Sequence, residues 1–285
     1  GLNGGGGGPA SLFQNPYPRD FRRGIYKWKS TVRGAKPTRH DLANVMQRGV
    51  RGTAMPSFAN VAESDKQALV DYIIYLSICG EFERKLLGYA IEEFDYDEKS
   101  KSSGLNWAAI TGDEELRSYV KSALAEIVRS WSDADQQVIN VPEPGSAEPT
   151  SIDHGEQLFH GQRANCASCH GQSGNGYATT LNYDEWAKEY SSSIGIAPDD
   201  RESLRPFRLA GAHRPRPIKP RPIAHGVFRG GSDSDTIFRR IVAGIDGTPM
   251  PAQLVAESGN KQGLTPDEIW DLVRYVESLT VGSSE

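Results

Sequence analysis

Two cysteines and a histidine lie within five consecutive residues, Cys166-Ala167-Ser168-Cys169-His170. Thiols at this spacing can each form a thioether bond to one vinyl group of the same porphyrin, and the next residue then lies beneath the iron. The imidazole of His170 is thereby positioned to be the proximal iron ligand. The spacing predicts that one haem is attached covalently through Cys166 and Cys169.

A structural zinc site and a redox dithiol are the two other uses of such a motif. A structural zinc site needs four protein ligands, which usually come from two cysteine pairs. Only Cys79 remains in the sequence, so a second pair cannot be formed. A thioredoxin-like dithiol is expected in a βαβ context, and the sequence pattern shows none. Haem attachment is therefore the favoured interpretation.

A methionine between two prolines, in Gly247-Thr248-Pro249-Met250-Pro251, follows further along the chain. A thioether is a soft, neutral ligand that favours ferrous iron and raises the reduction potential. Methionine also commonly fills gaps in a core. The two prolines stiffen the loop and hold the side chain in one direction, which favours a ligand role. We therefore predict Met250 as the distal axial ligand of the haem iron.

The attachment motif, the methionine loop and a closing C-terminal helix together resemble the class I cytochrome c family. The resemblance covers about residues 151–282. It implies an all-α domain that carries haem c with His170 and Met250 as its axial ligands. Haem of this type is attached outside the cytoplasm, so the resemblance also implies a periplasmic or otherwise exported protein.

The methionine loop has a counterpart near the start of the chain. Residues 45–56 and residues 241–251 both contain a glycine, a hydrophobic residue, any residue, Gly-Thr, any residue and Met-Pro. In this internal repeat Met55 takes the position of Met250. Residues 1–79 thus resemble the later part of a second class I cytochrome c domain, which begins just past its haem-binding histidine.

The segments that flank the two loops support the repeat. A capping box is predicted before the next helix in each copy, at Ser64 and at Thr265. Within these helices, Leu76 aligns with Leu279. Glycines 1, 4 and 6 also follow the spacing of glycines 171, 174 and 176, although glycine-rich tracts match each other easily.

The first copy contains no Cys-x-x-Cys-His motif within this sequence. Either the motif precedes Gly1, or this part of the chain has lost its haem. The first interpretation is favoured because Met55 still lies in its loop, where a haem-free domain would gain nothing from a thioether. We therefore predict a dihaem protein in which Met55 ligates a second haem c.

The predicted fold is all-α, with two cytochrome c-type helical domains in tandem joined by a helical connector. The predicted boundaries are residues 1–80 for the first domain, 81–150 for the connector and proline-rich linker, and 151–285 for the domain with the complete haem c site. An apolar helical stripe in the connector is expected to pack between the two domains. It consists of Leu116, Tyr119, Val120, Ala123, Ile127 and Trp131.

A basic, proline-rich insert separates the haem motif from the second methionine loop, over residues 182–225. Its prolines predict an irregular or polyproline-like conformation rather than a helix. One interpretation is a solvated loop with one or two arginines on the haem propionates. The other is a docking surface for an acidic redox partner. Its cations are Arg201, Arg205, Arg208, Arg214, Arg216, Lys219 and Arg221.

Charge and hydropathy argue against nucleic acid as a partner and against a membrane span. The formal net charge is −5, so nucleic acid is not an expected partner. No run of residues reaches the roughly 18 apolar positions of a membrane span, so we predict no transmembrane segment in this chain. The expected partners are other redox proteins, which donate and accept electrons.

The predicted function is electron transfer rather than catalysis, because an iron with two protein ligands has no open site for a substrate. One alternative is an electron-transfer subunit of a larger oxidoreductase, including a membrane-associated respiratory complex. A dihaem peroxidase or a gas-binding haem protein would need an open or displaceable sixth position. The two intact methionine loops argue against the peroxidase, and carbon monoxide binding to the reduced form would reveal a gas-binding protein.

Overall fold

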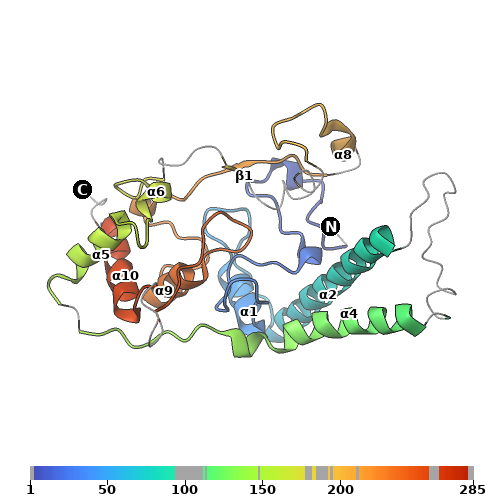
Figure 1. The fold of residues 1–285 in the computed structure, drawn as a ribbon, viewed down its shortest axis with the longest axis horizontal. Helices are drawn as coiled ribbons and strands as arrows, with labels where there is room; N and C mark the ends of the chain where they lie inside the picture. Colours follow the sequence, from blue (N-terminus) through green and yellow to red (C-terminus); the bar gives the residue numbers. More distant parts are fainter. Residues whose placement is uncertain are drawn as a thin grey trace.

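The computed structural model describes residues 3–93, 112, 114–146, 148–176, 182–183, 192, 195–209, 212–256 and 263–281. Two hydrophobic cores lie along the long axis of an elongated molecule (Figure 1). We call residues 3–137 around one core the first lobe, and residues 141–281 around the other the second lobe. The described residues are mostly helical, with one pair of two-residue strands, so the predicted helical class is confirmed.

The first lobe consists of helices and loops. Its elements are η1 (Ser11–Phe13), η2 (Phe21–Arg23), α1 (Arg39–Arg48), α2 (Glu63–Glu93), α4 (Glu114–Ser132) and η3 (Ala134–Gln137). Helix α1 begins with a capping box, in which Thr38 and Asp41 each accept a hydrogen bond from the other's backbone N–H. The buried core residues are Tyr26, Leu42, Met46, Val70, Ile127 and Trp131.

The second lobe is built around α5 and α10, which pack against each other (Figure 1). Its helices are α5 (Ser151–His160), α6 (Ala167–His170), α8 (Arg205–Leu209), η4 (Ile223–His225), α9 (Ser234–Ala243) and α10 (Pro266–Val281). The strands β1 (Asn182–Tyr183) and β2 (Pro217–Ile218) pair antiparallel, with Asn182 opposite Ile218.

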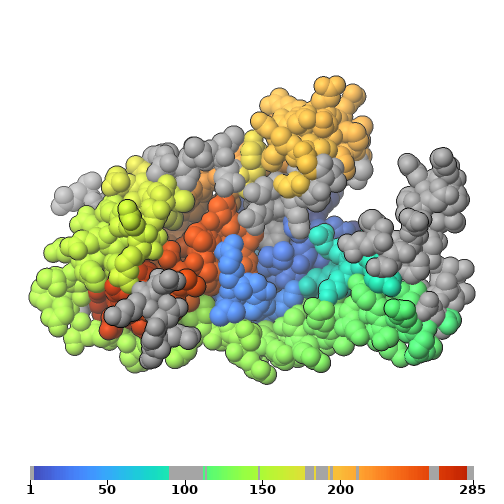
Figure 2. Space-filling model, viewed as in Figure 1, coloured from blue at the N-terminus to red at the C-terminus, as the bar shows by residue number. Residues whose placement is uncertain are grey.

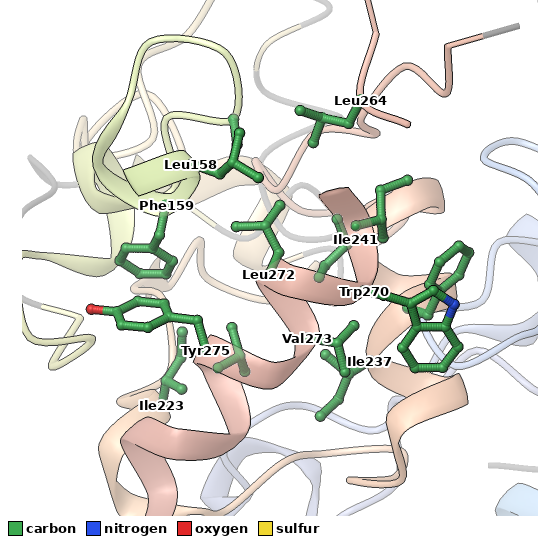
Figure 3. Packing of buried hydrophobic residues seen from close by; sticks show 14 of the residues in the cluster. Leu158, Phe159, Ile223, Ile237, Ile241, Leu264, Trp270, Leu272, Val273 and Tyr275 are labelled. Carbon is green, nitrogen blue, oxygen red and sulfur yellow. The ribbon is translucent and has the colours of Figure 1, made fainter. Parts of the chain in front are cut away.

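The core of the second lobe joins α5, α9 and α10 (Figure 3). Phe159 on α5 meets Tyr275 on α10 edge to face, with ring centroids 5.3 Å apart. Trp270 packs instead against Phe238 of α9, at 5.1 Å. Aromatic pairs in these geometries add to the stabilisation that burial alone gives. The first pair holds α5, and with it the segment that leads to the cysteines, against the C-terminal helix, and the second pair holds α9 there.

Helix α2 differs from the expectation in two ways. The predicted boundary of the first domain, at residue 80, falls inside this helix, which runs on to Glu93. A glycine costs an α-helix only about 1 kcal/mol, and Gly80 allows the backbone of Arg22 to approach closely. The capping role of Ser64 is also wrong, since the helix already begins at Glu63, whose carboxylate pairs with Lys66 at 2.8 Å.

The cap predicted for the corresponding helix of the second lobe is confirmed. The backbone N–H of Glu268 donates to Thr265 Oγ1 at 3.2 Å, and that of Thr265 donates to Glu268 Oε2 at 2.8 Å. These reciprocal bonds satisfy two donors at the start of α10. None of the described helices has both the length and the apolar character that a membrane span requires.

The connector helix α4 packs within the first lobe rather than between the lobes. Leu116, Ala123, Ile127 and Trp131 are buried, as the apolar stripe predicts, but α4 lies against α2 and the first core (Figure 1). The expectation of interlobe packing is therefore wrong. The lobes meet through loops instead, among them residues 29–34 with residues 246–250. This arrangement follows because the long helix α2 already offers α4 an apolar partner.

Helices α5 and α10 approach so closely at Gly155 that a side chain has no room there. A Cβ atom added at Gly155 would lie 2.1 Å from the backbone oxygen of Asp271. We expect Gly155→Ala to destabilise the protein by about 1–3 kcal/mol, as overpacking does. Gly88→Ala is the matched control, because nothing lies within 4 Å of the added atom in α2. Thermal unfolding should show a lower midpoint for the first variant and no loss for the second.

The basic insert is not wholly irregular. Helix α8 forms at residues 205–209, so the expectation of no helix is wrong there. Asp200 accepts hydrogen bonds from the backbone N–H groups of Glu202 and Ser203, at 3.2 and 3.0 Å. Leu204 is only 2% exposed and anchors this turn. Residues 184–191, 193–194 and 210–211 of the insert lie outside the described residues.

One cation of the insert binds the first lobe. The guanidinium of Arg216 lies 3.5 Å from the ring centroid of Tyr17 and donates to the backbone oxygens of Leu12, at 2.9 Å, and Gln14. His213 stacks on the same tyrosine at 4.3 Å. Arg216 therefore joins the lobes, which neither interpretation of the insert anticipated. The other six cations of the insert are exposed. The part of the insert around α8 projects from one edge of the molecule (Figure 2).

Candidate haem site

The two cysteines and the histidine lie in one helical turn. The backbone N–H groups of Cys169 and His170 both donate to the carbonyl oxygen of Cys166, at 3.1 and 2.9 Å. Asn165, just before this turn, has a positive φ of 50°, which turns the chain sharply out of the preceding loop. The short helix α6 thus brings Cys166, Cys169 and His170 together, as their spacing predicts.

Burial dominates the electrostatics of this turn. It raises the pKa of the Cys166 thiol to about 11, because a buried thiolate is poorly solvated. Burial also lowers the pKa of His170, and the backbone carbonyl of Arg221 opposes this effect. The neutral imidazole is the form that can ligate a metal. Phe159 lies beside it, with ring centroids 6.4 Å apart.

These residues fit a covalently attached haem. All three cysteines of the chain are free thiols, so Cys166 and Cys169 are available for thioether bonds. The Nδ1 atom of His170 is buried and makes no hydrogen bond of regular geometry. Among the described residues, no group of three or more His, Cys, Asp or Glu side chains could hold a metal ion. The turn therefore matches haem attachment better than a zinc site.

Met250 lies on a tight loop after α9. The backbone N–H of Ile245 donates to the carbonyl oxygen of Met250 at 3.2 Å, which closes the loop. Thr248 Oγ1 donates to Ile245 O at 2.8 Å and accepts from the Met250 N–H at 3.3 Å. Gly244 ends α9 with φ 65°, and its missing Cβ leaves room for the oxygen of Met250. The loop holds the Met250 backbone in one conformation.

A hydrogen bond links the segment after the methionine loop to the segment just before the haem motif. Gln253 Nε2 donates to the carbonyl oxygen of Ala164, two residues before Cys166, at 3.1 Å. The backbone N–H of Gln253 donates to Ile241 of α9 at 3.2 Å. The structure thus brings the three motif residues together directly, and it links Met250 to them through Gln253. No sequence pattern marked Gln253 in advance.

The loop that carries Met55 has the same hydrogen bonds. Val50 N–H donates to Met55 O at 3.1 Å, and Thr53 Oγ1 donates to Val50 O at 2.8 Å and accepts from Met55 N–H at 3.1 Å. Gly49 ends α1 with φ 66°, where its missing Cβ leaves room for the oxygen of Met55. The repeat seen in the sequence is therefore a repeat of backbone structure at the two loops.

The glycine-rich segments also correspond. Phe21 N–H donates to Gly4 O at 2.9 Å, as Ile223 N–H donates to Gly174 O at 2.7 Å. A Cβ atom at Gly4 would meet Leu76, and one at Gly174 would meet Leu279. The weak glycine match and the alignment of Leu76 with Leu279 thus describe real structural equivalents.

Met55 lines a cavity of about 1080 Å³ in the first lobe. Ligand pockets typically measure about 300–1000 Å³, so this space is large enough for a cofactor. Apolar side chains from α1 and the methionine loop form one wall, among them Leu42, Met46 and Val50. Met46 is 5% exposed and belongs to the core, as expected of a gap-filling methionine.

The cavity has a strongly basic rim. Its lining includes one carboxylate, Asp20, which forms an ion pair with Arg22 at 2.9 Å. A rim of this kind favours an anionic group, because charge-assisted hydrogen bonds from guanidinium to carboxylate are strong. The cations that line it are Arg19, Arg22, Arg23, Lys27, Arg84 and Arg229.

Residues 152–280 match the family model for cytochrome c. This part of the chain is therefore similar to cytochrome c domains, a family that carries covalently bound haem c. A chain of the reducing HAO-like protein complex of Kuenenia stuttgartiensis has a similar structure, with a TM-score of 0.58 and 24% sequence identity. The similarity covers 97% of this chain and 88% of that chain, so the shared fold includes the first lobe. No curated protein matches the chain significantly.

Proposed function

We propose that the protein transfers electrons through a haem c attached to Cys166 and Cys169, with His170 and Met250 as axial ligands. When bound, the haem supplies an iron that gains and loses one electron. His170 and Met250 set its reduction potential, and the surrounding core excludes water. The observation that carries the proposal is the helical turn of free cysteines and buried imidazole within the part of the chain that is similar to cytochrome c domains.

We propose further that the first lobe is a second cytochrome c-type domain, which makes the protein a tandem dihaem cytochrome of class I. The repeated methionine loop and the cavity beside Met55 support this proposal. Met55 would be the distal ligand, and the basic rim would bind the propionates. The proximal attachment motif of this haem would precede Gly1.

The carrier function predicts that neither iron has an open coordination site. The reduced protein should therefore bind no carbon monoxide at neutral pH, because a histidine and a methionine would ligate each iron. The absorption spectrum of the dithionite-reduced protein, recorded before and after addition of the gas, checks this. Rapid spectral change at one haem, together with peroxide turnover, would instead support a peroxidase.

The protein would work with other redox proteins outside the cytoplasm. Haem attachment of this type requires export, so we propose a periplasmic or otherwise extracytoplasmic location. The exposed cations Arg201, Arg205, Arg208 and Arg214 offer a surface for an acidic partner. A second candidate is an electron-transfer subunit of a larger oxidoreductase, because the structurally similar chain belongs to a protein complex.

A further inference from the structure

Residues of the first lobe donate hydrogen bonds to the methionine loop of the second lobe. Arg33 Nη1 donates to the backbone oxygen of Met250 at 2.7 Å, and its Nη2 donates to Thr248 O at 3.3 Å. The backbone N–H of Gly34 lies 3.2 Å from Asp246 Oδ2. Residues of the first lobe thus reach three positions of one short loop, which lies where the two lobes meet near the centre of the molecule (Figure 2).

A buried ion pair reinforces these contacts. Lys29 Nζ lies 2.5 Å from Asp246 Oδ2, with the two side chains only 4% and 9% exposed. The same ammonium donates to the backbone oxygens of Val32, at 2.9 Å, and Ala35, at 2.5 Å. Its three N–H donors are therefore all used, which a buried ammonium requires. Loss of one member of such a pair leaves an uncompensated charge and is strongly destabilising.

These contacts are added to the hydrogen bonds that both methionine loops share. The loop around Met55 has Arg51 where the second loop has Asp246, and Arg51 is exposed. The oxygen of Met250 accepts from Ile245 within its loop and also from Arg33 across the interface. The first lobe has a longer segment between η2 and α1 than the second lobe has between η4 and α9, and Lys29 and Arg33 lie in it.

We propose that Arg33 and the Lys29–Asp246 pair are positioning residues for Met250, so that the first lobe maintains the axial ligation of the haem in the second. This inference rests on the proposed function. It makes the ligation of one haem depend on the docking of the other lobe. Loss of the contacts would release the loop, favour exchange of the thioether for another ligand and lower the reduction potential.

The experiment measures Met250 ligation in the holoprotein. A Met55→Ala background removes the other thioether, so the near-infrared iron–thioether band then reports Met250 alone. The pH at which this band disappears gives the equilibrium constant for ligand exchange. We expect Arg33→Ala to shift that constant about tenfold or more towards exchange, in line with the loss of a hydrogen bond from a charged group. Arg33→Lys should recover part of the loss, because it keeps one donor.

The Lys29→Met/Asp246→Leu double variant removes the pair without leaving a buried charge, so it guards against a variant that fails to fold. It should shift ligand exchange in the same direction as Arg33→Ala. Arg39→Ala is the matched control, because its ion pair with Asp71 is exposed and includes no residue of the loop. The control should keep both the exchange constant and the midpoint potential of the parent.

Two outcomes would overturn the inference in different ways. If the Met55→Ala parent shows the band, and Arg33→Ala and the double variant exchange ligands as the parent does, the positioning role is wrong and the proposed function stands. If the parent carries haem but shows no band, Met250 is not a ligand, and the proposed function fails together with the inference.

Discussion

Replacement of Met250 by alanine is expected to remove the iron–thioether band of the second lobe and to lower the reduction potential of its haem. A thioether stabilises ferrous iron, and axial ligands set haem potentials over a range of about 0.8 V, so we expect a fall on the order of 0.1 V or more. Met250→His should lower the potential as well, because imidazole donates more strongly to ferric iron. Optical redox titration and near-infrared absorption measure both effects.

Met46→Leu is the matched control for this experiment. Met46 is a core methionine on α1 in the first lobe, and a change to leucine keeps its volume. The control should keep the band and the potential of the haem in the second lobe. Met55 would also contribute to the band, so the Met55→Ala/Met250→Ala double variant should lack it completely. A band that persists in the double variant would refute both ligand assignments.

The second large effect is expected at Met55. If a haem fills the cavity of the first lobe, redox titration of the protein should show two components, and Met55→Ala should shift one of them downward. The other component should respond to Met250→Ala. The reason is the same for both, because the two loops share their backbone hydrogen bonds. A redox titration with a single component that Met55→Ala does not shift would mean that the first lobe carries no haem.

Much of the candidate site could be predicted from local sequence. The attachment motif fixes its three residues in one turn, and the glycines that end α1 and α9 are fixed by the close approach of the methionine loops. Both features depend on residues within about ten positions of one another. The repeat was therefore visible in the sequence and is found again in the hydrogen bonds.

The interface between the lobes could not be predicted in this way. Arg33 meets Met250, and Arg216 meets Gln14, across more than half of the chain and between loops that have no periodic pattern. The apolar stripe of α4 showed that the helix is buried but could not show on which lobe, since such a stripe can pack against any apolar surface. The continuous course of α2 does not follow from the repeat, because the corresponding helix α10 is shorter and the predicted domain boundary at residue 80 falls inside α2.

The most direct test of the account is the number of haems on one chain. The pyridine haemochrome spectrum of the purified full-length protein gives the haem content, and its intact mass gives the number attached covalently. The account predicts two haems c per chain, one of which is lost when Cys166 and Cys169 are both replaced by alanine. One haem per chain, lost completely in that variant, would contradict the dihaem account and leave a single-haem cytochrome with a haem-free first lobe.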